Sequence, residues 1–150
     1  MYQRILVPLE HSVYDSAILD HVRRLATLCD ASIVLMHVAD GWAARNMKAL
    51  ALQESEEIAR DRHYLEQTCA GLRAEGLVAE AVLAAGDPAS EICAAAHREG
   101  CDLIAMATHG HRGLQDLIYG ATADSVRHHT MVPVLMVRGP TPGAASSTES

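Results

Sequence analysis

The stretch Ala107 to Thr122, ATHGHRGLQDLIYGAT, decides how the rest of the chain is interpreted. It follows the apolar segment Leu103 to Ala107 (LIAMA), which is typical of a strand buried on both faces of a parallel sheet. It leads into a helix that we expect to end near His129. Its three glycines let the backbone turn at positive φ and let a phosphate approach the amide groups. Spacing alone leaves a second interpretation open, a glycine turn followed by a glycine for close helix packing.

The rest of the chain repeats this alternation of apolar segment and amphipathic helix. The expected strands are Arg4 to Leu9, Ser32 to Val38, Val78 to Ala84, Leu103 to Ala107 and Val132 to Arg138. The expected helices run from a Ser12 cap to Cys29, from about Lys48 to Gly76, from Asp87 and Pro88 to Gly100, and up to His129. This pattern predicts an α/β fold with a doubly wound, Rossmann-like, five-stranded parallel sheet of order 3-2-1-4-5 and helices on both faces.

Ligands of such sheets bind outside the carboxyl ends of the strands, where the winding direction reverses. If the first strand is central and the fourth lies beside it, that crevice lies between Pro8 to Glu10 and Ala107 to Gly110. Arg112 can add a bidentate charge to a phosphate there. The sequence has no GxxxxGK[ST], and the turn after the first strand, PLEHSVYD, has no glycine. A Walker NTPase and a dinucleotide-binding domain are therefore disfavoured.

Composition limits the class of protein. With 150 residues, 49% of them hydrophobic and only 3% aromatic, the chain fits one globular domain with an aliphatic core. The net charge of −7 argues against sequence-independent binding of DNA or RNA. No apolar run reaches the roughly 18 residues of a bilayer span, and the start is too short for a signal peptide. We expect a cytoplasmic location, one domain over residues 1–138 and a disordered, polar tail over residues 139–150.

The cysteines and histidines indicate no metal site. Cys29, Cys69, Cys93 and Cys101 are widely spaced and form no CxxC pair, so we interpret them as core residues in a reducing cytosol. His109 and His111 can approach one metal ion, but no third ligand has the spacing of a known motif. His109 is interpreted instead as a loop residue that touches a phosphate or ribose. His128 and His129 are explained by the negative end of their helix.

The long helix presents a mixed-charge face, with Glu56 and Arg60 as an attractive pair and Glu57 and Asp61 as a repulsive one. We interpret that face as a solvated surface. Trp42, the only tryptophan, lies in a connection beside the expected crevice, where it covers a base, anchors a partner or packs its own loop. The sequence shows no nucleophile and base at informative spacing and no paired carboxylates. We therefore predict no catalytic residues and at most slow, incidental nucleotide hydrolysis.

Four segments, in order along the chain, resemble the universal stress protein family: ILVPLEHS, GDPASEI, DLIAMATHGHRGL and YGATADSVRHHTMVPVLMVR. The resemblance covers roughly residues 3 to 138 and is specific in the last third, where the family pattern is G-x2-G-x9-G followed by Ser or Thr. On this chain the pattern falls on Ala107, Gly110, Gly120 and Ala121. Ala121 lacks a hydroxyl that faces the phosphates in the family, at a cost of about 0.5 to 1.5 kcal/mol, or up to about tenfold in affinity.

The resemblance implies a regulatory ligand, ATP or a related adenine nucleotide, with Mg²⁺ or Mn²⁺ beside its phosphates. Glu10 would lie near the ribose, where the family usually has Asp, and the base would contact the backbone at His37, Val38 and Ala39. The predicted nucleotide-binding residues are Pro8, Leu9, Glu10, Val38, Ala39, Ala107, His109, Gly110, Arg112, Gly113, Gly120, Ala121 and Thr122.

The last strand, Val132 to Arg138, would lie at an edge of the sheet, where a long apolar strand is an aggregation hazard unless it is paired. Pairing with a second copy about a two-fold axis removes that hazard. The resemblance also implies such a homodimer. The alternative function is a scaffold of the same fold that binds no nucleotide and acts on an unknown protein partner through its dimer and partner surfaces, which Ala121 favours.

Overall fold

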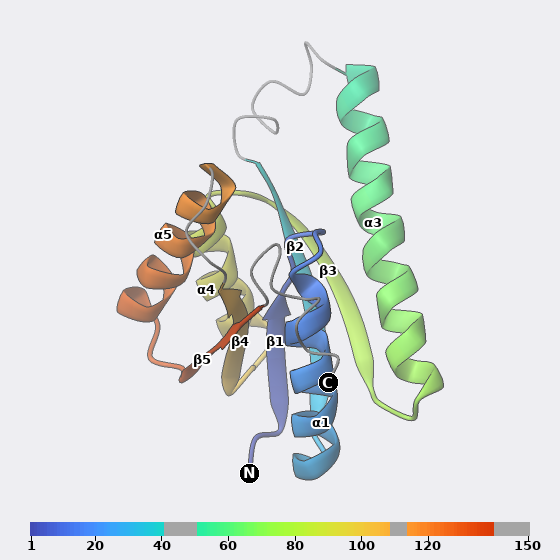
Figure 1. Ribbon diagram of the computed structural model, residues 1–150, viewed down its shortest axis with the longest axis vertical. Helices are drawn as coiled ribbons and strands as arrows, with labels where there is room; N and C mark the ends of the chain where they lie inside the picture. Colours follow the sequence, from blue (N-terminus) through green and yellow to red (C-terminus); the bar gives the residue numbers. More distant parts are fainter. Residues whose placement is uncertain (41–50, 109–113, 140–150) are drawn as a thin grey trace, which may run out of the picture.

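A parallel sheet forms the centre of the computed structural model, which describes residues 1–40, 51–108 and 114–139 (Figure 1). Within that part of the chain the strands are β1 (Arg4–Pro8), β2 (Ser32–Asp40), β3 (Ala79–Gly86), β4 (Leu103–Thr108) and β5 (Val134–Arg138). The helices are α1 (Asp15–Cys29), α3 (Ala51–Ala74), α4 (Pro88–Arg98) and α5 (Leu114–His129). All strand pairs are parallel and the order is β3-β2-β1-β4-β5, which confirms the predicted fold class and topology.

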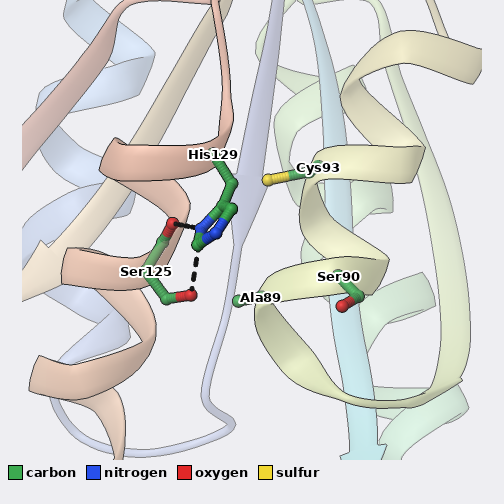
Figure 2. A pocket seen from close by; sticks show the side chains of 5 residues that line it. All are labelled: Ala89, Ser90, Cys93, Ser125 and His129. Carbon is green, nitrogen blue, oxygen red and sulfur yellow. Dashed lines mark hydrogen bonds between the residues drawn. The ribbon is translucent and has the colours of Figure 1, made fainter.

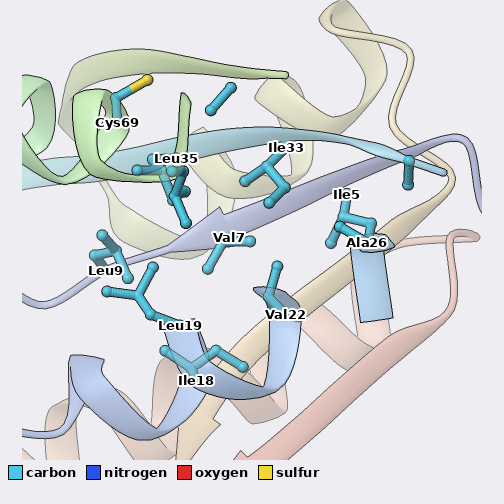
Figure 3. Close-up of a cluster of buried hydrophobic side chains, with 14 of the residues drawn as sticks. Ile5, Val7, Leu9, Ile18, Leu19, Val22, Ala26, Ile33, Leu35 and Cys69 are labelled. Carbon is cyan, nitrogen blue, oxygen red and sulfur yellow. The ribbon is translucent and has the colours of Figure 1, made fainter. Parts of the chain in front are cut away.

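The sheet is covered on both faces by helices. Helices α1 and α3 enclose one core cluster, and α4 and α5 enclose the other. Successive side chains of β1 pack into opposite core clusters: Ile5 and Val7 lie in the cluster of α1 and α3, whereas Leu6 lies in that of α4 and α5. Figure 3 shows the first cluster, with Val7 of β1 facing Val22 of α1. This burial on both faces explains why the central strands are continuous apolar runs instead of alternating ones.

Helix α1 begins later than the sequence suggested. It starts at Asp15, its N-cap is Tyr14 and no side chain caps it, so the prediction of a Ser12 cap is wrong. Ser12 Oγ instead accepts a hydrogen bond from the amide of Tyr14, and its carbonyl accepts from the amide of Asp15. The reason is the Asp15 carboxylate, which draws the preceding amides around itself and forces His11 to a φ of 66°.

The four cysteines are free thiols, as predicted. Cys69 and Cys101 are buried, and Cys29 and Cys93 are half-buried beside the two core clusters. Burial raises the pKa of the Cys101 thiol to about 11, so it stays protonated at neutral pH.

Some sequence predictions fall outside the described residues, namely those for Trp42 and for the tail after Gly139. None of the helices in the described part of the chain combines the length and hydropathy that a bilayer span requires.

Helix α4 begins as predicted, with Asp87 as N-cap and Pro88 in the first turn. The Asp87 carboxylate accepts hydrogen bonds from the amide and the hydroxyl of Ser90, which lower the pKa of Asp87. We expect Asp87→Ala to lower the free energy of unfolding by about 1 kcal/mol, measured by urea unfolding at neutral pH.

The matched control for this change is Asp87→Asn, because asparagine caps a helix about as well as aspartate. A carboxyl with a lowered pKa stabilises the fold above its ordinary pKa and loses that contribution as the pH falls. The difference between wild type and Asp87→Ala should therefore shrink in acid. Equal stability of wild type and Asp87→Ala at neutral pH would show that the cap contributes nothing.

Candidate functional site

The carboxyl ends of β1 and β4 are adjacent but unpaired with each other. Their register comprises Ile5 with Leu103 and Leu6 with Ile104, whereas β1 continues to Pro8 and β4 to Thr108. The winding direction reverses between these two parallel strands, because the chain proceeds from β1 to β2 and β3 on one side and then crosses over to β4 and β5 on the other. Such a switch point is where doubly wound sheets hold their ligands. The structure therefore has its switch point between β1 and β4, where the sequence predicts a ligand crevice.

One wall of the expected crevice is formed where β1 ends against β2, which continues to Asp40 beside β3. Pro8 pairs with Met36, and the Leu9 amide donates to the Met36 carbonyl at 2.7 Å. Pro8 and Glu10 are half-buried there, as are Val38 and Ala39 two and three residues beyond Met36. The structure thus brings Pro8 and Leu9 beside Met36 of β2, and the contact of Pro8 to Glu10 with a ribose and a base stays a prediction.

Leu9 has a different place from its neighbours. Its side chain is buried in the core cluster of α1 and α3, and its amide and carbonyl are both hydrogen-bonded within the fold. Leu9 therefore sets the shape of the wall and presents no free polar group to a ligand.

The turn between β1 and α1 is organised by the carboxylate of Asp15, which is only 2% exposed. Its oxygens accept hydrogen bonds from the amides of Glu10 at 2.9 Å, His11 at 2.8 Å and Ser12 at 3.3 Å, and from the Tyr64 hydroxyl at 2.6 Å. Burial and the bond to Asp15 raise the pKa of Tyr64. These three amides face an internal anion and are therefore not free to donate to a phosphate.

The remaining predicted site residues belong to the segment after β4. Ala107 is buried at the end of β4, beside Val137 of β5, and Thr122 is buried on α5. Gly120 and Ala121 also fall within the bounds of α5. His109, Gly110, Arg112 and Gly113 lie outside the described residues.

Asp61 of α3 is a site residue that the sequence analysis misplaced. It was assigned to a solvated surface, yet its side chain is 13% exposed and lies between two histidines, with Oδ1 2.8 Å from His11 Nδ1 and Oδ2 3.4 Å from His37 Nε2. The expected pair of Glu56 with Arg60 is not among the ion pairs of the described residues. A signal was present, because position 61 extends the buried stripe of Leu65 and Cys69 by one helical turn.

A second pocket lies between α4 and α5, on the other face of the sheet (Figure 2). Its volume is about 250 Å³, and Cys93 and His129 face it from opposite helices. Burial raises the pKa of the Cys93 thiol, and His129 Nδ1 donates to the Ser125 carbonyl at 2.7 Å. Cys93 is therefore a thiol and not the thiolate of a nucleophile. His129 therefore interacts with a carbonyl of the last turn of its helix, as predicted. His128 Nδ1 likewise donates to the Asp124 carbonyl.

Among the described residues, no group of three or more His, Cys, Asp and Glu side chains is arranged to hold a metal ion.

Comparison with known proteins decides the family. The model of the universal stress protein family matches residues 1–138. The chain belongs to the universal stress protein family. Universal stress protein MJ0577 of Methanocaldococcus jannaschii is 26% identical to this universal stress protein over 92% of this chain and 96% of its own length.

Solved structures agree with this fold. The structure of MJ0577 matches with a TM-score of 0.75 and 28% identity over 93% of this chain and 98% of its own. The universal stress protein UspA of Lactobacillus plantarum matches with a TM-score of 0.78 and 21% identity over 91% of this chain and 98% of its own.

Two further structures of this fold were solved with a nucleotide. A universal stress protein of Archaeoglobus fulgidus in complex with dAMP matches with a TM-score of 0.69 and 19% identity over 91% of this chain and 98% of its own. A universal stress protein in complex with cAMP matches with a TM-score of 0.67 and 17% identity over 91% of this chain and 97% of its own.

The bond from Tyr64 to Asp15 gives a direct test of how this universal stress protein holds its β1–α1 turn. Tyr64→Phe removes the hydroxyl that donates to a buried carboxylate, so we expect a loss of roughly 1.5 to 3 kcal/mol in the free energy of unfolding, measured with urea. Tyr2→Phe is the matched control, because Tyr2 packs half-buried on the same core cluster and its hydroxyl makes none of the hydrogen bonds found among the described residues. Equal stability of the two variants would contradict the role assigned to Asp15.

Proposed function

We propose that this universal stress protein is a cytoplasmic homodimer that binds ATP or a related adenine nucleotide as a regulatory ligand. The observation that carries the proposal is the crevice where β1 and β4 end unpaired, at the switch point of a fold that binds dAMP and cAMP in two structural relatives.

The wall formed by β1 and β2 suits a nucleoside. The Glu10 carboxylate is half-buried and already accepts from the Ser12 hydroxyl at 3.2 Å, so it offers an acceptor to the hydroxyls of a ribose. Val38 and Ala39 are half-buried and apolar, which suits one face of a purine. The bonds of Leu9 to Met36 and His37 hold the end of β1 at a fixed spacing from β2, so the wall is formed before the ligand arrives.

We assign phosphate binding to the segment after β4, because the amides of the β1–α1 turn are occupied by Asp15. By resemblance to the family, Gly110, Arg112, Gly113 and Gly120 to Thr122 would hold them, with His109 beside a phosphate or the ribose. Mg²⁺ or Mn²⁺ would neutralise the phosphate charge when ATP is bound.

A regulatory role fits better than an enzymatic one. The buried carboxylates near the crevice, Asp15 and Asp61, are both engaged with partners in the fold. Hydrolysis would need a base aimed at a water beside the phosphates. We therefore propose that any hydrolysis is slow and incidental.

Two substitutions in the segment after β4 test the nucleotide assignment in opposite directions. Gly120→Val places a branched side chain where the family brings a phosphate close to the backbone, so we expect ATP binding to be lost. Ala121→Ser restores the family's hydroxyl, and we expect up to about tenfold tighter binding. Both affinities are measured by calorimetry with Mg²⁺ present.

The control for these two variants is Gly71→Val on α3, where an added Cβ meets no atom within 4 Å. It should bind ATP as the wild type does. Unchanged ATP affinity in Gly120→Val would overturn the assignment of the phosphate site.

The proposed homodimer forms through the last strand, over Val132 to Arg138. In the sheet, β5 is an edge strand, and Met136 on it is 42% exposed. An apolar edge of this kind is normally paired or covered. We also propose a protein partner, which neither the sequence nor the fold identifies.

Met136→Asp should convert the dimer to a monomer at micromolar concentration, measured by sedimentation velocity, because the substitution places a charge on the pairing edge. Leu28→Asp is the matched control, since Leu28 is 83% exposed but lies on α1, away from the strand edge. A monomeric wild type, or a Met136→Asp variant that stays dimeric, would contradict the proposed interface.

The alternative is a scaffold of the same fold that binds no nucleotide, and Ala121 is the residue that favours it. Mass spectrometry of the ligand released from purified protein separates the two functions. An adenine nucleotide in the released fraction supports the regulatory ligand, whereas protein that neither carries nor binds one supports the scaffold.

A further inference from the structure

Asp61 joins helix α3 to the ends of β1 and β2 through two imidazoles. It contacts His11 in the β1–α1 turn at 2.8 Å and His37 on β2 at 3.4 Å. The side chains of Asp61 and His37 are only 13% and 11% exposed. A carboxylate with so little solvent needs a cation or hydrogen-bond donors around it. The protons on the two imidazoles therefore decide whether this contact stabilises the fold.

The bond to Leu9 fixes one proton of His37. His37 Nδ1 lies 2.9 Å from the Leu9 carbonyl, and a carbonyl only accepts, so Nδ1 is the donor. A neutral His37 would then have a lone pair on Nε2, 3.4 Å from a carboxylate oxygen that is also an acceptor. That arrangement is repulsive, so the contact with ionised Asp61 requires a second proton on Nε2. A proton on Nε2 turns this contact into an ion pair, whereas its loss leaves two acceptors facing each other across 3.4 Å.

His11 needs no second proton to make its contact. A single proton on Nδ1 donates to Asp61, and the ring stacks on Tyr64 with centroids 4.1 Å apart and planes at 13°. The Tyr64 hydroxyl in turn donates to Asp15. A series of side-chain contacts therefore links α3 to the turn after β1: it runs from Asp61 through His11 and Tyr64 to Asp15. The contact with His37 links the Asp61 carboxylate to β2.

The groups that face His37 come from each element packed around it. They are the Leu9 carbonyl from β1, Asp61 from α3, and the His11 ring from the turn, whose centroid is 6.5 Å away at a right-angled 89°. On β3 its register partner is the apolar Leu83. Leu35 faces the α1 and α3 cluster, so His37, two residues on, lies on that same side and away from α4 and α5.

Protons can reach this cluster from solvent. His11 is 37% exposed and lines an open cavity of about 470 Å³ together with Arg60, His63, Tyr64 and Gln67. The cluster can therefore respond to the pH of its surroundings without unfolding of the protein.

We propose that Asp61, His37 and His11 form a proton-dependent latch that fixes α3 against the end of β2, and that Asp61 is thereby a positioning residue for the nucleotide crevice. The coupling rests on the proposed function: His37 directly precedes Val38, and its ring holds the carbonyl of Leu9, next to Glu10. Loss of the Nε2 proton as the pH rises opens the latch and loosens the wall that the base and ribose contact. Nucleotide affinity is therefore higher at low pH and falls at high pH.

The first test follows the imidazole protons by ¹⁵N–¹H correlation spectra of the full chain, without nucleotide, between about pH 5.5 and pH 8.5, the range in which histidines commonly change charge. We expect His37 to carry protons on both nitrogens at the acid end and to keep only the Nδ1 proton at the alkaline end. In Asp61→Asn, the neutral amide can donate to Nε2, so His37 should be in the neutral form at a lower pH than in wild type. A wild-type His37 that is neutral throughout would overturn the latch.

The second test measures ATP affinity by calorimetry at both ends of that range. We expect wild-type affinity to fall at least about fivefold more than that of Asp61→Asn, the lower end of ordinary coupling between sites. Glu57→Gln is the matched control, because it removes a charge from an exposed residue one turn earlier on α3 and should behave as wild type. Titration of ATP itself affects all three proteins alike, so the comparison is made between variants at each pH.

The two tests separate the latch from the proposed function. If ATP fails to bind at any pH, the proposed function and its coupling to Asp61 are overturned, while the spectra still decide the latch. If ATP binds with the same pH dependence in wild type and in Asp61→Asn, the positioning role of Asp61 is overturned and the proposed function stands.

Discussion

The carboxylate of Asp15 is the anion around which the functional end of this molecule is built. It is buried, and a buried carboxylate is tolerated only where donors surround it, so the chain must bring three turn amides and the Tyr64 hydroxyl to it. Meeting that requirement sets the path of the chain after β1, the late start of α1 and the position of α3. Glu10 and His11 are placed by the same constraint.

This arrangement determines which parts of the crevice are available to the sugar, the base and the phosphates of a nucleotide. Amides that would otherwise attract a phosphate are occupied by an internal anion. In the proposed function, the β1–α1 turn therefore contacts the sugar and the base, and the segment after β4 binds the phosphates. In many nucleotide-binding folds the first turn is glycine-rich and holds the phosphates itself. The proton-sensitive contacts of Asp61 extend the same wall outward to α3 and give it a means of responding to pH.

The fold was predictable because its signals are local and repeated. Buried strands such as Ile5 to Val7 and Ile33 to Met36 are apolar on both faces, and helix boundaries such as Asp87 with Pro88 carry their own capping chemistry. The roles of Asp15 and Asp61 were not predictable in this way. Each depends on partners 49 or 50 positions distant in the sequence, and an acidic residue on a helix is usually solvated.

In the proposed function, an adenine nucleotide occupies the crevice between the ends of β1 and β4. Mapping of backbone amide chemical shifts during titration with ATP and Mg²⁺ tests it most directly. We expect the largest changes at Glu10, Val38 and Ala39, with Ser125 and Cys93 between α4 and α5 little affected. Changes concentrated between α4 and α5, or none at saturating ATP, would contradict it.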